Sequence, residues 1–223
     1  MDSVIRGDFR LFIFEEGVDF SLPAGWIGDV LHLAEVRSHN VRSSEPNSTT
    51  VSRDEFIPLD YRVVTGDVID AELPWIVDAY NDAFLRLAQS CSHDPLATSP
   101  FKVSAININV MVGTGATYEW HVDSNPLTGL LFATTHLDDE GGQLEFDIQG
   151  ELLTVLPQAG KLLFFDARTV PHVVRPLRRE SDTRVSIPMN YYVRGESIRR
   201  PGDLDGSIYG QAPLRVHARL VRA

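Results

Sequence analysis

Residues 115–123, GATYEWHVD, form the stretch of this chain that is most informative about its fold. The stretch ends in His121, Val122 and Asp123, and glycines precede it while Asn125-Pro126 follows it. Turn residues on both sides of a short aromatic run predict a strand over 117–123. Successive side chains on a strand point to opposite faces, so His121 and Asp123 would direct an imidazole and a carboxylate into one space.

Further short strands surround this one, and they define the expected fold class. From residue 101 onward, glycine, proline or charged turns separate runs of branched and aromatic residues. Short strands at such spacing indicate an antiparallel sandwich or jelly roll. With one long helix outside it, the chain is expected to be α+β and mainly β. The expected strands are 102–113, 117–123, 129–137, 143–148, 151–157, 161–166, 171–177 and 184–193.

The first hundred residues carry other patterns. Residues 8–14 predict a first strand, and residues 24–36 fit either a short strand or a helix. Apolar residues at helical spacing predict a helix over 73–88, with Pro74 in its first turn. The polar stretch 37–55 indicates a loop.

The length of the chain suits one domain. We expect residues 1–223 to form a single unit, in which residues 1–100 elaborate the N-terminus and residues 101–194 form the jelly-roll core. Residues 195–223 would be a C-terminal extension that is irregular over 195–213.

Charge and cysteine content exclude several functions. The 223 residues include 20 Lys and Arg against 31 Asp and Glu, a net charge of −11, which argues against binding nucleic acid or an anionic membrane. The single cysteine, Cys91, rules out an internal disulfide and fits a reducing, cytoplasmic location. No stretch is apolar for long enough to span a membrane, and the first residues do not resemble a secretion signal.

A second histidine completes a candidate metal site. His172 begins another expected strand, and two histidines with one carboxylate are the ligand set that holds Fe(II) with one side open. An H-x-D triplet alone arises often by chance, and a strand histidine is more commonly structural. Arg184 and Ser186 share a face of the next strand, where a guanidinium and a hydroxyl would bind a carboxylate.

The order of these motifs resembles the Fe(II)/2-oxoglutarate-dependent oxygenase superfamily, in particular its prolyl-4-hydroxylase-like branch. GATYEWHVD is similar to the branch's G-x-x-Y-x-x-H-x-D run, and HLDDEGGQLEF looks like its Gly-Gly hairpin. LPQAGKLLFFDARTVPHVVRPL is similar to its approach to the distal histidine, and RVS over 184–186 ends the pattern. The resemblance covers about residues 105–193, less than half of the chain.

The resemblance implies a double-stranded β-helix with Fe(II) bound by His121, Asp123 and His172. It implies 2-oxoglutarate as cosubstrate, held by Arg184 and Ser186 with Tyr118 and Asn109 beside it. Dioxygen would be the second cosubstrate, and succinate and CO2 the products, with ascorbate as a stimulant. Since related halogenases lack the carboxylate, Asp123 favours hydroxylation, although desaturation or cyclisation uses the same ligand set.

Two departures from the branch bear on the substrate. The branch often has a 2-oxoglutarate-binding tyrosine where this chain has Val112, and we expect Asn107, Asn109, Tyr118 or Thr134 to replace it. The branch often has lysine where this chain has Arg184, and arginine followed by serine is more familiar among small-molecule oxygenases. We therefore expect a small-molecule substrate, such as an amino acid or a natural-product intermediate.

Three alternatives stay open at this stage. The first is a hydroxylase of a protein or peptide residue such as proline, and the second is a β-sandwich binding module that has kept a structural metal. The third, a cupin-type metalloenzyme, usually has an H-x-H motif that this chain lacks. The sequence does not indicate the oligomeric state. Of the remaining histidines, His136 is expected to be structural or to lie at the rim of the substrate site. The others have no partner at ligand spacing; they are His32, His39, His93 and His217.

Overall fold

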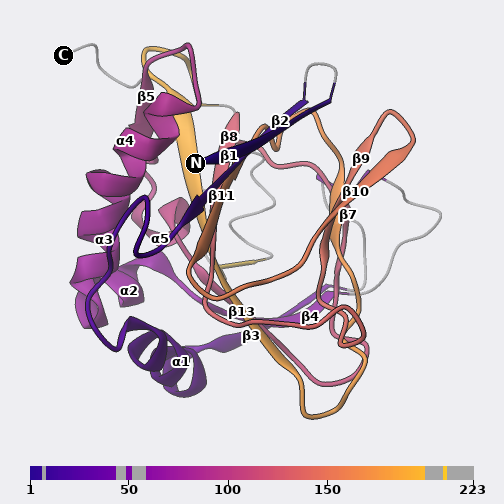
Figure 1. Cartoon of the computed structure of the whole chain (residues 1–223). Coiled ribbons are helices and arrows are strands. Elements are labelled where there is room, and N and C mark those ends of the chain that lie inside the picture. The colour runs from indigo at the N-terminus through magenta and orange to yellow at the C-terminus, as the bar shows by residue number, and fades with distance from the viewer. Residues whose placement is uncertain (7–8, 44–48, 52–58, 199–207, 210–223) are drawn as a thin grey trace.

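Two antiparallel sheets face each other in the computed structural model, which describes residues 1–6, 9–43, 49–51, 59–198 and 208–209. The larger sheet has nine strands in the order β1-β2-β11-β8-β13-β6-β4-β3, with β5 paired to β13. The smaller sheet has the order β10-β9-β12-β7 and stands opposite the larger one (Figure 1). This is the expected jelly roll, so the predicted fold class is confirmed.

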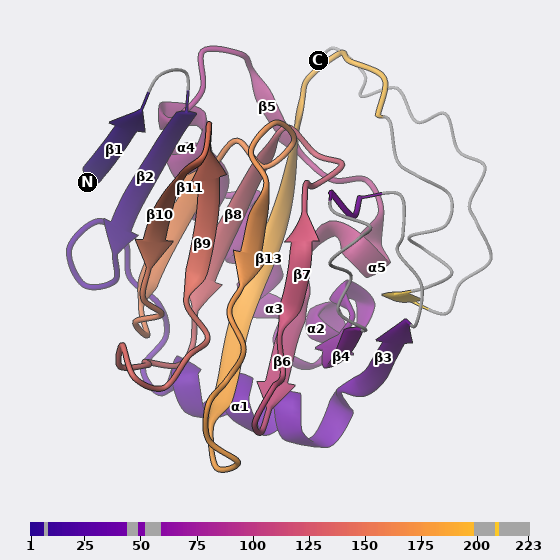
Figure 2. The same cartoon turned by 90° about the vertical axis from the view of Figure 1, so that its right-hand side faces the viewer.

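The strands are short, as the spacing of the turns predicts. Those of the larger sheet are β1 Asp2–Arg6, β2 Phe9–Glu15, β3 His39–Ser43, β4 Leu59–Val64, β5 Leu96–Thr98, β6 Ile108–Val112, β8 Leu127–Phe132, β11 Lys161–Phe165 and β13 Thr183–Val193. Those of the smaller sheet are β7 Tyr118–His121, β9 Leu144–Ile148, β10 Glu151–Val155 and β12 His172–Val174. Figure 2 views the molecule from the side of the smaller sheet, so that β7, β9 and β10 lie in front of strands of the larger sheet.

Helices cover the outer face of the larger sheet (Figure 1). They are α1 Trp26–Arg37, α2 Gly66–Glu72, α3 Pro74–Asn81, α4 Ala83–Ser90 and the single turn α5 Lys102–Ala105. No helix among the described residues is long and apolar enough to cross a membrane.

Alternation along the central strands gives the larger sheet two different faces. On β13, Val185, Ile187, Met189 and Tyr191 are fully buried in the core beneath the helices. The alternate residues of β13 line the pocket between the two sheets; they are Arg184, Ser186, Pro188 and Asn190. The inner face therefore carries the polar groups, while the outer face supplies the packing that holds the sheet rigid.

Several details differ from the sequence-based expectations. A strand, β1, precedes the one expected to be first, and the ambiguous residues 24–36 contain helix α1. The expected helix over 73–88 is two helices, because the backbone leaves helical geometry at Asp82, with φ −125° and ψ −82°. The strand expected over 102–113 begins as α5, and strand β6 starts only at Ile108.

The expectation of a loop over 37–55 is wrong for its first part. Residues His39–Ser43 form β3, which pairs with β4 along its whole length, from His39↔Val63 to Ser43↔Leu59. Residues 49–51 also pair, with β7, while residues 44–48 and 52–55 lie outside the described part. In the C-terminal extension only residues up to 198 and 208–209 are described, so the expected irregular course of 195–213 is mostly outside it.

Candidate metal centre

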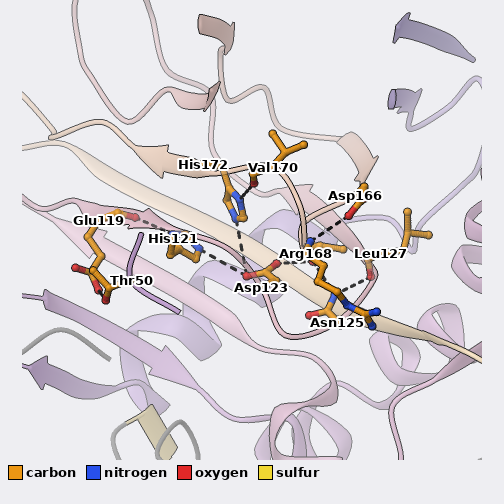
Figure 3. A network of polar contacts seen from close by, with 11 residues as sticks. Thr50, Glu119, His121, Asp123, Asn125, Leu127, Asp166, Arg168, Val170 and His172 are labelled. Carbon is orange, nitrogen blue, oxygen red and sulfur yellow. Dashed lines mark hydrogen bonds and ion pairs between the residues drawn. The ribbon is translucent and has the colours of Figure 1, made fainter. Parts of the chain in front are cut away.

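Three side chains converge where the two sheets meet. His121 ends β7, Asp123 follows two residues later, and His172 begins β12, which lies next to β7 with His172 opposite His121. One ligand atom from each residue lies within 4.8 Å of the others. Asp123 Oδ1 is 3.6 Å from His121 Nε2 and 3.8 Å from His172 Nε2, as Figure 3 shows. This spacing leaves room for one metal ion between the three atoms.

Backbone carbonyls orient both imidazole rings. The Nδ1 of His121 lies 2.7 Å from the Glu119 carbonyl oxygen, and the Nδ1 of His172 lies 3.1 Å from that of Val170. A carbonyl accepts only, so each Nδ1 donates and each Nε2 keeps its lone pair for the centre of the site. Metal-binding histidines are commonly held in this way.

Burial keeps His121 in the neutral form that a metal requires. Its removal from water, and then the nearby His172, lower the pKa of His121 to about 4, against the opposing effect of Asp123. At neutral pH its Nε2 is therefore unprotonated. Two imidazoles and one carboxylate are a suitable donor set for Fe(II).

Arg184 is a buried cation whose surroundings leave room for an anion. The residue is 2% exposed, its Nε donates to the Gly142 carbonyl at 2.8 Å, and its Nη1 donates to Ser186 Oγ at 3.0 Å. Its Nη2 is buried without a hydrogen-bond partner among the described residues. Burial lowers the pKa of Arg184 to about 10, so it stays charged at neutral pH. An unpaired buried guanidinium is costly, and a bound carboxylate would relieve that cost.

The same pocket contains the three converging residues and Arg184. Asn107, Asn109 and Tyr118 also line it, so the asparagines that alternate with Ile106 and Ile108 face the interior. In the pairing of β13 with β6, Ser186 is opposite Asn109, and Arg184, two residues earlier on β13, is opposite Met111. The pocket thus brings together every predicted site residue: His121, Asp123, His172, Arg184, Ser186, Tyr118 and Asn109.

Other residues considered from the sequence lie elsewhere. Val112 is 51% exposed because alternation turns it outward, and its neighbour Met111 is the residue that faces the pocket. Thr134 bonds to the backbone of Val185 outside the pocket. His136 is buried against the Thr183 carbonyl, 3.1 Å from its Nε2.

Sequence reasoning missed several residues that line the pocket. Thr49 comes from the segment 49–51, which pairs with β7: the Val122 amide donates to the Thr49 carbonyl at 3.0 Å. Ile208 and Tyr209 come from the C-terminal extension, and Tyr61 comes from β4. The alternating run LDYRVV over 59–64 is the one signal that could have indicated Tyr61, as an inward residue of a strand.

Comparison with known proteins agrees with this geometry. Residues 106–192 match the family model of the 2OG-Fe(II) oxygenase superfamily. No protein with a curated description matches the sequence.

Many solved structures share the fold. An oxidoreductase of the 2OG-Fe(II) oxygenase family from Burkholderia pseudomallei is 14% identical, with a TM-score of 0.63 over 86% of this chain and 89% of that chain. The α-ketoglutarate-dependent epimerase SnoN from nogalamycin biosynthesis is 18% identical, with a TM-score of 0.62 over 91% of this chain and 86% of that chain. A prolyl hydroxylase from Trichoplax adhaerens, in complex with a peptide fragment, is 19% identical, with a TM-score of 0.56 over 82% of this chain and 83% of that chain.

The matched segment and the site agree with each other. Residues 106–192 are similar to the 2OG-Fe(II) oxygenase superfamily and contain all three converging side chains, which together indicate a 2-oxoglutarate-dependent Fe(II) oxygenase. The superfamily of the matched model uses iron and 2-oxoglutarate, and SnoN has been solved in complex with Fe3+ and α-ketoglutarate.

Proposed function

We propose that this oxygenase hydroxylates an unactivated C–H bond of a small molecule. The observation that carries the proposal is how the pocket is bordered. Thr49, Ile208 and Tyr209 line it together with the candidate metal ligands, and all three lie outside the matched family segment. A pocket lined by several separate chain segments suits a compact substrate better than an extended peptide, which needs an open groove.

In this proposal His121, Asp123 and His172 hold the iron. Arg184 and Ser186 bind the distal carboxylate of 2-oxoglutarate, and Tyr118 and Asn109 flank it. When bound, the iron and 2-oxoglutarate supply the oxidation of a C–H bond by dioxygen, with succinate and CO2 as products. The protein orients the two cosubstrates, excludes water and presents one C–H bond of the substrate.

The substrate class rests on the pocket and not on likeness in fold. SnoN has been solved with nogalamycin RO, whereas the Trichoplax enzyme has been solved with a peptide fragment, and both have this fold. The arginine at position 184 further supports a small molecule, because lysine is frequent there in the prolyl-hydroxylase branch. Peptide hydroxylation is the competing outcome in the test below.

The first experiment measures whether the site assembles. Anaerobic protein with Fe(II) and 2-oxoglutarate should show the weak visible charge-transfer band of the ternary complex. His172→Ala should abolish the band, and Arg184→Ala should raise the 2-oxoglutarate concentration needed to produce it at least about tenfold. His32→Ala, which removes an exposed histidine on α1, is the control and should match wild type. A folded wild-type protein that binds no iron would refute the assignment.

The second experiment addresses the substrate. Succinate release is measured with pools of amino acids and of polycyclic natural products, and separately with proline-containing peptides. We expect release above the substrate-free rate with members of the small-molecule pools only. Stimulation by the peptides alone would favour the peptide hydroxylase.

A further inference from the structure

His136 lies behind Arg184, outside the pocket. Its side chain is 5% exposed and is not among the residues that line the pocket. The Nε2 of His136 lies 3.1 Å from the Thr183 carbonyl oxygen, and because a carbonyl only accepts, the imidazole is the donor. Thr183 begins β13 and immediately precedes Arg184. The ring therefore holds the peptide group that joins Thr183 to Arg184.

This hydrogen bond replaces strand pairing on one side of β13. The register between β8 and β13 does not extend to Val185 or Thr183. The Val185 amide donates instead to the Thr134 hydroxyl at 3.0 Å. Alternate residues of a strand direct their backbone groups to the same neighbour, so the Thr183 carbonyl faces this side as well. Side chains of Thr134 and His136 therefore hold the backbone on either side of Arg184.

Gly142 brings His136 close to the stem of Arg184. Its carbonyl accepts from Arg184 Nε at 2.8 Å. A Cβ added at Gly142 would lie 3.2 Å from Arg184 Cδ and 3.6 Å from His136 Nδ1, so the arginine and the imidazole approach the same point. His136 Nδ1 is buried without a hydrogen-bond partner among the described residues. Within this part of the chain, the side chain therefore acts through its Nε2 bond.

We propose that His136 is a positioning residue for the cosubstrate: its bond to the Thr183 carbonyl fixes the start of β13 and thereby aims the Arg184 guanidinium at the distal carboxylate of 2-oxoglutarate. The inference rests on the proposed function, in which Arg184 binds that carboxylate. Charge-assisted hydrogen bonds depend on distance and direction, so a small movement of the strand at Arg184 weakens them. Since His136 does not line the pocket, it acts on the cosubstrate only through Arg184.

The test compares two 2-oxo acids in the anaerobic Fe(II) form of the full chain, with the charge-transfer band as the readout. 2-Oxoglutarate has a distal carboxylate, and 2-oxopentanoate has the same carbon chain without it. His136→Phe keeps a planar ring and removes the donor. We expect it to raise the Kd for 2-oxoglutarate about fivefold and to leave the Kd for 2-oxopentanoate unchanged. A purely structural role would weaken the binding of both acids.

Two amide variants form a matched pair. In His136→Gln the amide nitrogen takes the place of Nε2, so both Kd values should stay within about twofold of wild type. In His136→Asn the shorter side chain places its amide nitrogen near the position of Nδ1, away from the Thr183 carbonyl. This variant should behave like His136→Phe, and it carries the same expectation if the phenylalanine variant does not fold.

An Arg184→Ala background separates positioning from packing. If His136 acts through Arg184, His136→Asn should have no further effect there on the Kd for 2-oxoglutarate. A further loss in that background would overturn the inference. An unchanged Kd for 2-oxoglutarate in His136→Phe and His136→Asn, or an equal rise for both acids, would also overturn it. Failure of wild type to bind 2-oxoglutarate, or to prefer it to 2-oxopentanoate, would instead refute the proposed function of Arg184, and the inference with it.

Discussion

The Thr128 hydroxyl donates a hydrogen bond of 2.5 Å to Asp123 Oδ2, while Asp123 Oδ1 faces both histidines. Thr128 is on β8 of the larger sheet, whereas His121 and His172 are on the smaller sheet. The Asn125 side-chain amide donates to Thr128 Oγ1 at 2.8 Å, which leaves the hydroxyl proton for the carboxylate. The carboxylate is therefore oriented by the opposite sheet before any metal binds.

Thr128→Val should weaken iron binding. The substitution keeps the shape of the side chain but removes the donor, so Asp123 is free to rotate away from the two imidazoles. Loss of such a supporting contact typically costs about 10- to 100-fold in metal affinity. Competition with a coloured chelator measures the change, and Thr128→Ser, which restores the hydroxyl, should bind within a few-fold of wild type. Equal affinity in wild type and Thr128→Val would contradict this role.

Gly141→Ala should destabilise the protein and loosen Arg184. Gly141 has a φ of +82°, and an added Cβ would overlap the carbonyl oxygen of Pro176. The neighbouring Gly142 supplies the carbonyl that accepts from Arg184 Nε, so movement of this turn disturbs the cosubstrate site. We expect a loss of about 3 kcal/mol or more in the free energy of unfolding, measured in urea.

Gly150→Ala is the matched control for this substitution. Gly150 has a similar φ of +89°, but nothing lies within 4 Å of an added Cβ. Its cost should be limited to backbone strain, about 1 kcal/mol, with 2-oxoglutarate affinity unchanged. Equal losses at the two glycines would show that the contact with Pro176 is unimportant.

Local patterns explain why much of the core was predictable. Glycine and proline turns mark the ends of β9, β10 and β11, and the strands predicted at 143–148, 151–157 and 161–166 agree with them to within two residues. Strand β3 was not predictable in this way, because its polar sequence HNVRS is extended only through pairing with β4. The break at Asp82 was equally invisible, since the apolar spacing continues across it.

The same distinction applies to the candidate site, of which some residues were predictable from local sequence patterns and others were not. The convergence of His121, Asp123 and His172 followed from alternation on strands and from the order of the motifs. Tyr61, Thr49 and Tyr209 come from segments far from these motifs, and only the folded chain brings them to the pocket. On β6, Met111 faces the pocket while Val112 faces solvent, because a shift of one residue along a strand exchanges the two faces.

Thr50→Val should destabilise the segment that borders the pocket. Glu119 is 3% exposed, and its Oε1 accepts a hydrogen bond of 2.7 Å from the Thr50 hydroxyl. Removing the donor leaves a buried carboxyl group poorly satisfied, which costs about 1 to 3 kcal/mol. Hydrogen exchange should quicken at the Val51 and Val122 amides, which pair this segment with β7. Thr50→Ser keeps the hydroxyl and should exchange as wild type does. Exchange at the wild-type rate in Thr50→Val as well would argue against the contact.

Cys91 should react slowly in the folded protein, with a steep dependence on pH. Burial raises the pKa of the Cys91 thiol from 9.0 to about 11, against a smaller opposing effect of Ser90. Only the thiolate attacks iodoacetamide, so at pH 8 the folded protein should be alkylated about 100-fold more slowly than the urea-unfolded chain. Between pH 9 and 11 the unfolded chain loses this proton first, so the thiol also lowers the free energy of unfolding as pH rises.

The control for this last prediction is Cys91→Ser. Because Cys91 is the single cysteine of the chain, this variant has no thiol to label or to ionise. Its free energy of unfolding should fall less than that of wild type between pH 9 and 11, because the serine hydroxyl stays protonated in both the folded and the unfolded state. The difference between the two curves isolates the thiol from the lysines and tyrosines that also titrate in this range. Coincident curves, or equally fast alkylation of folded and unfolded protein at pH 8, would show that the Cys91 sulfur is in contact with water.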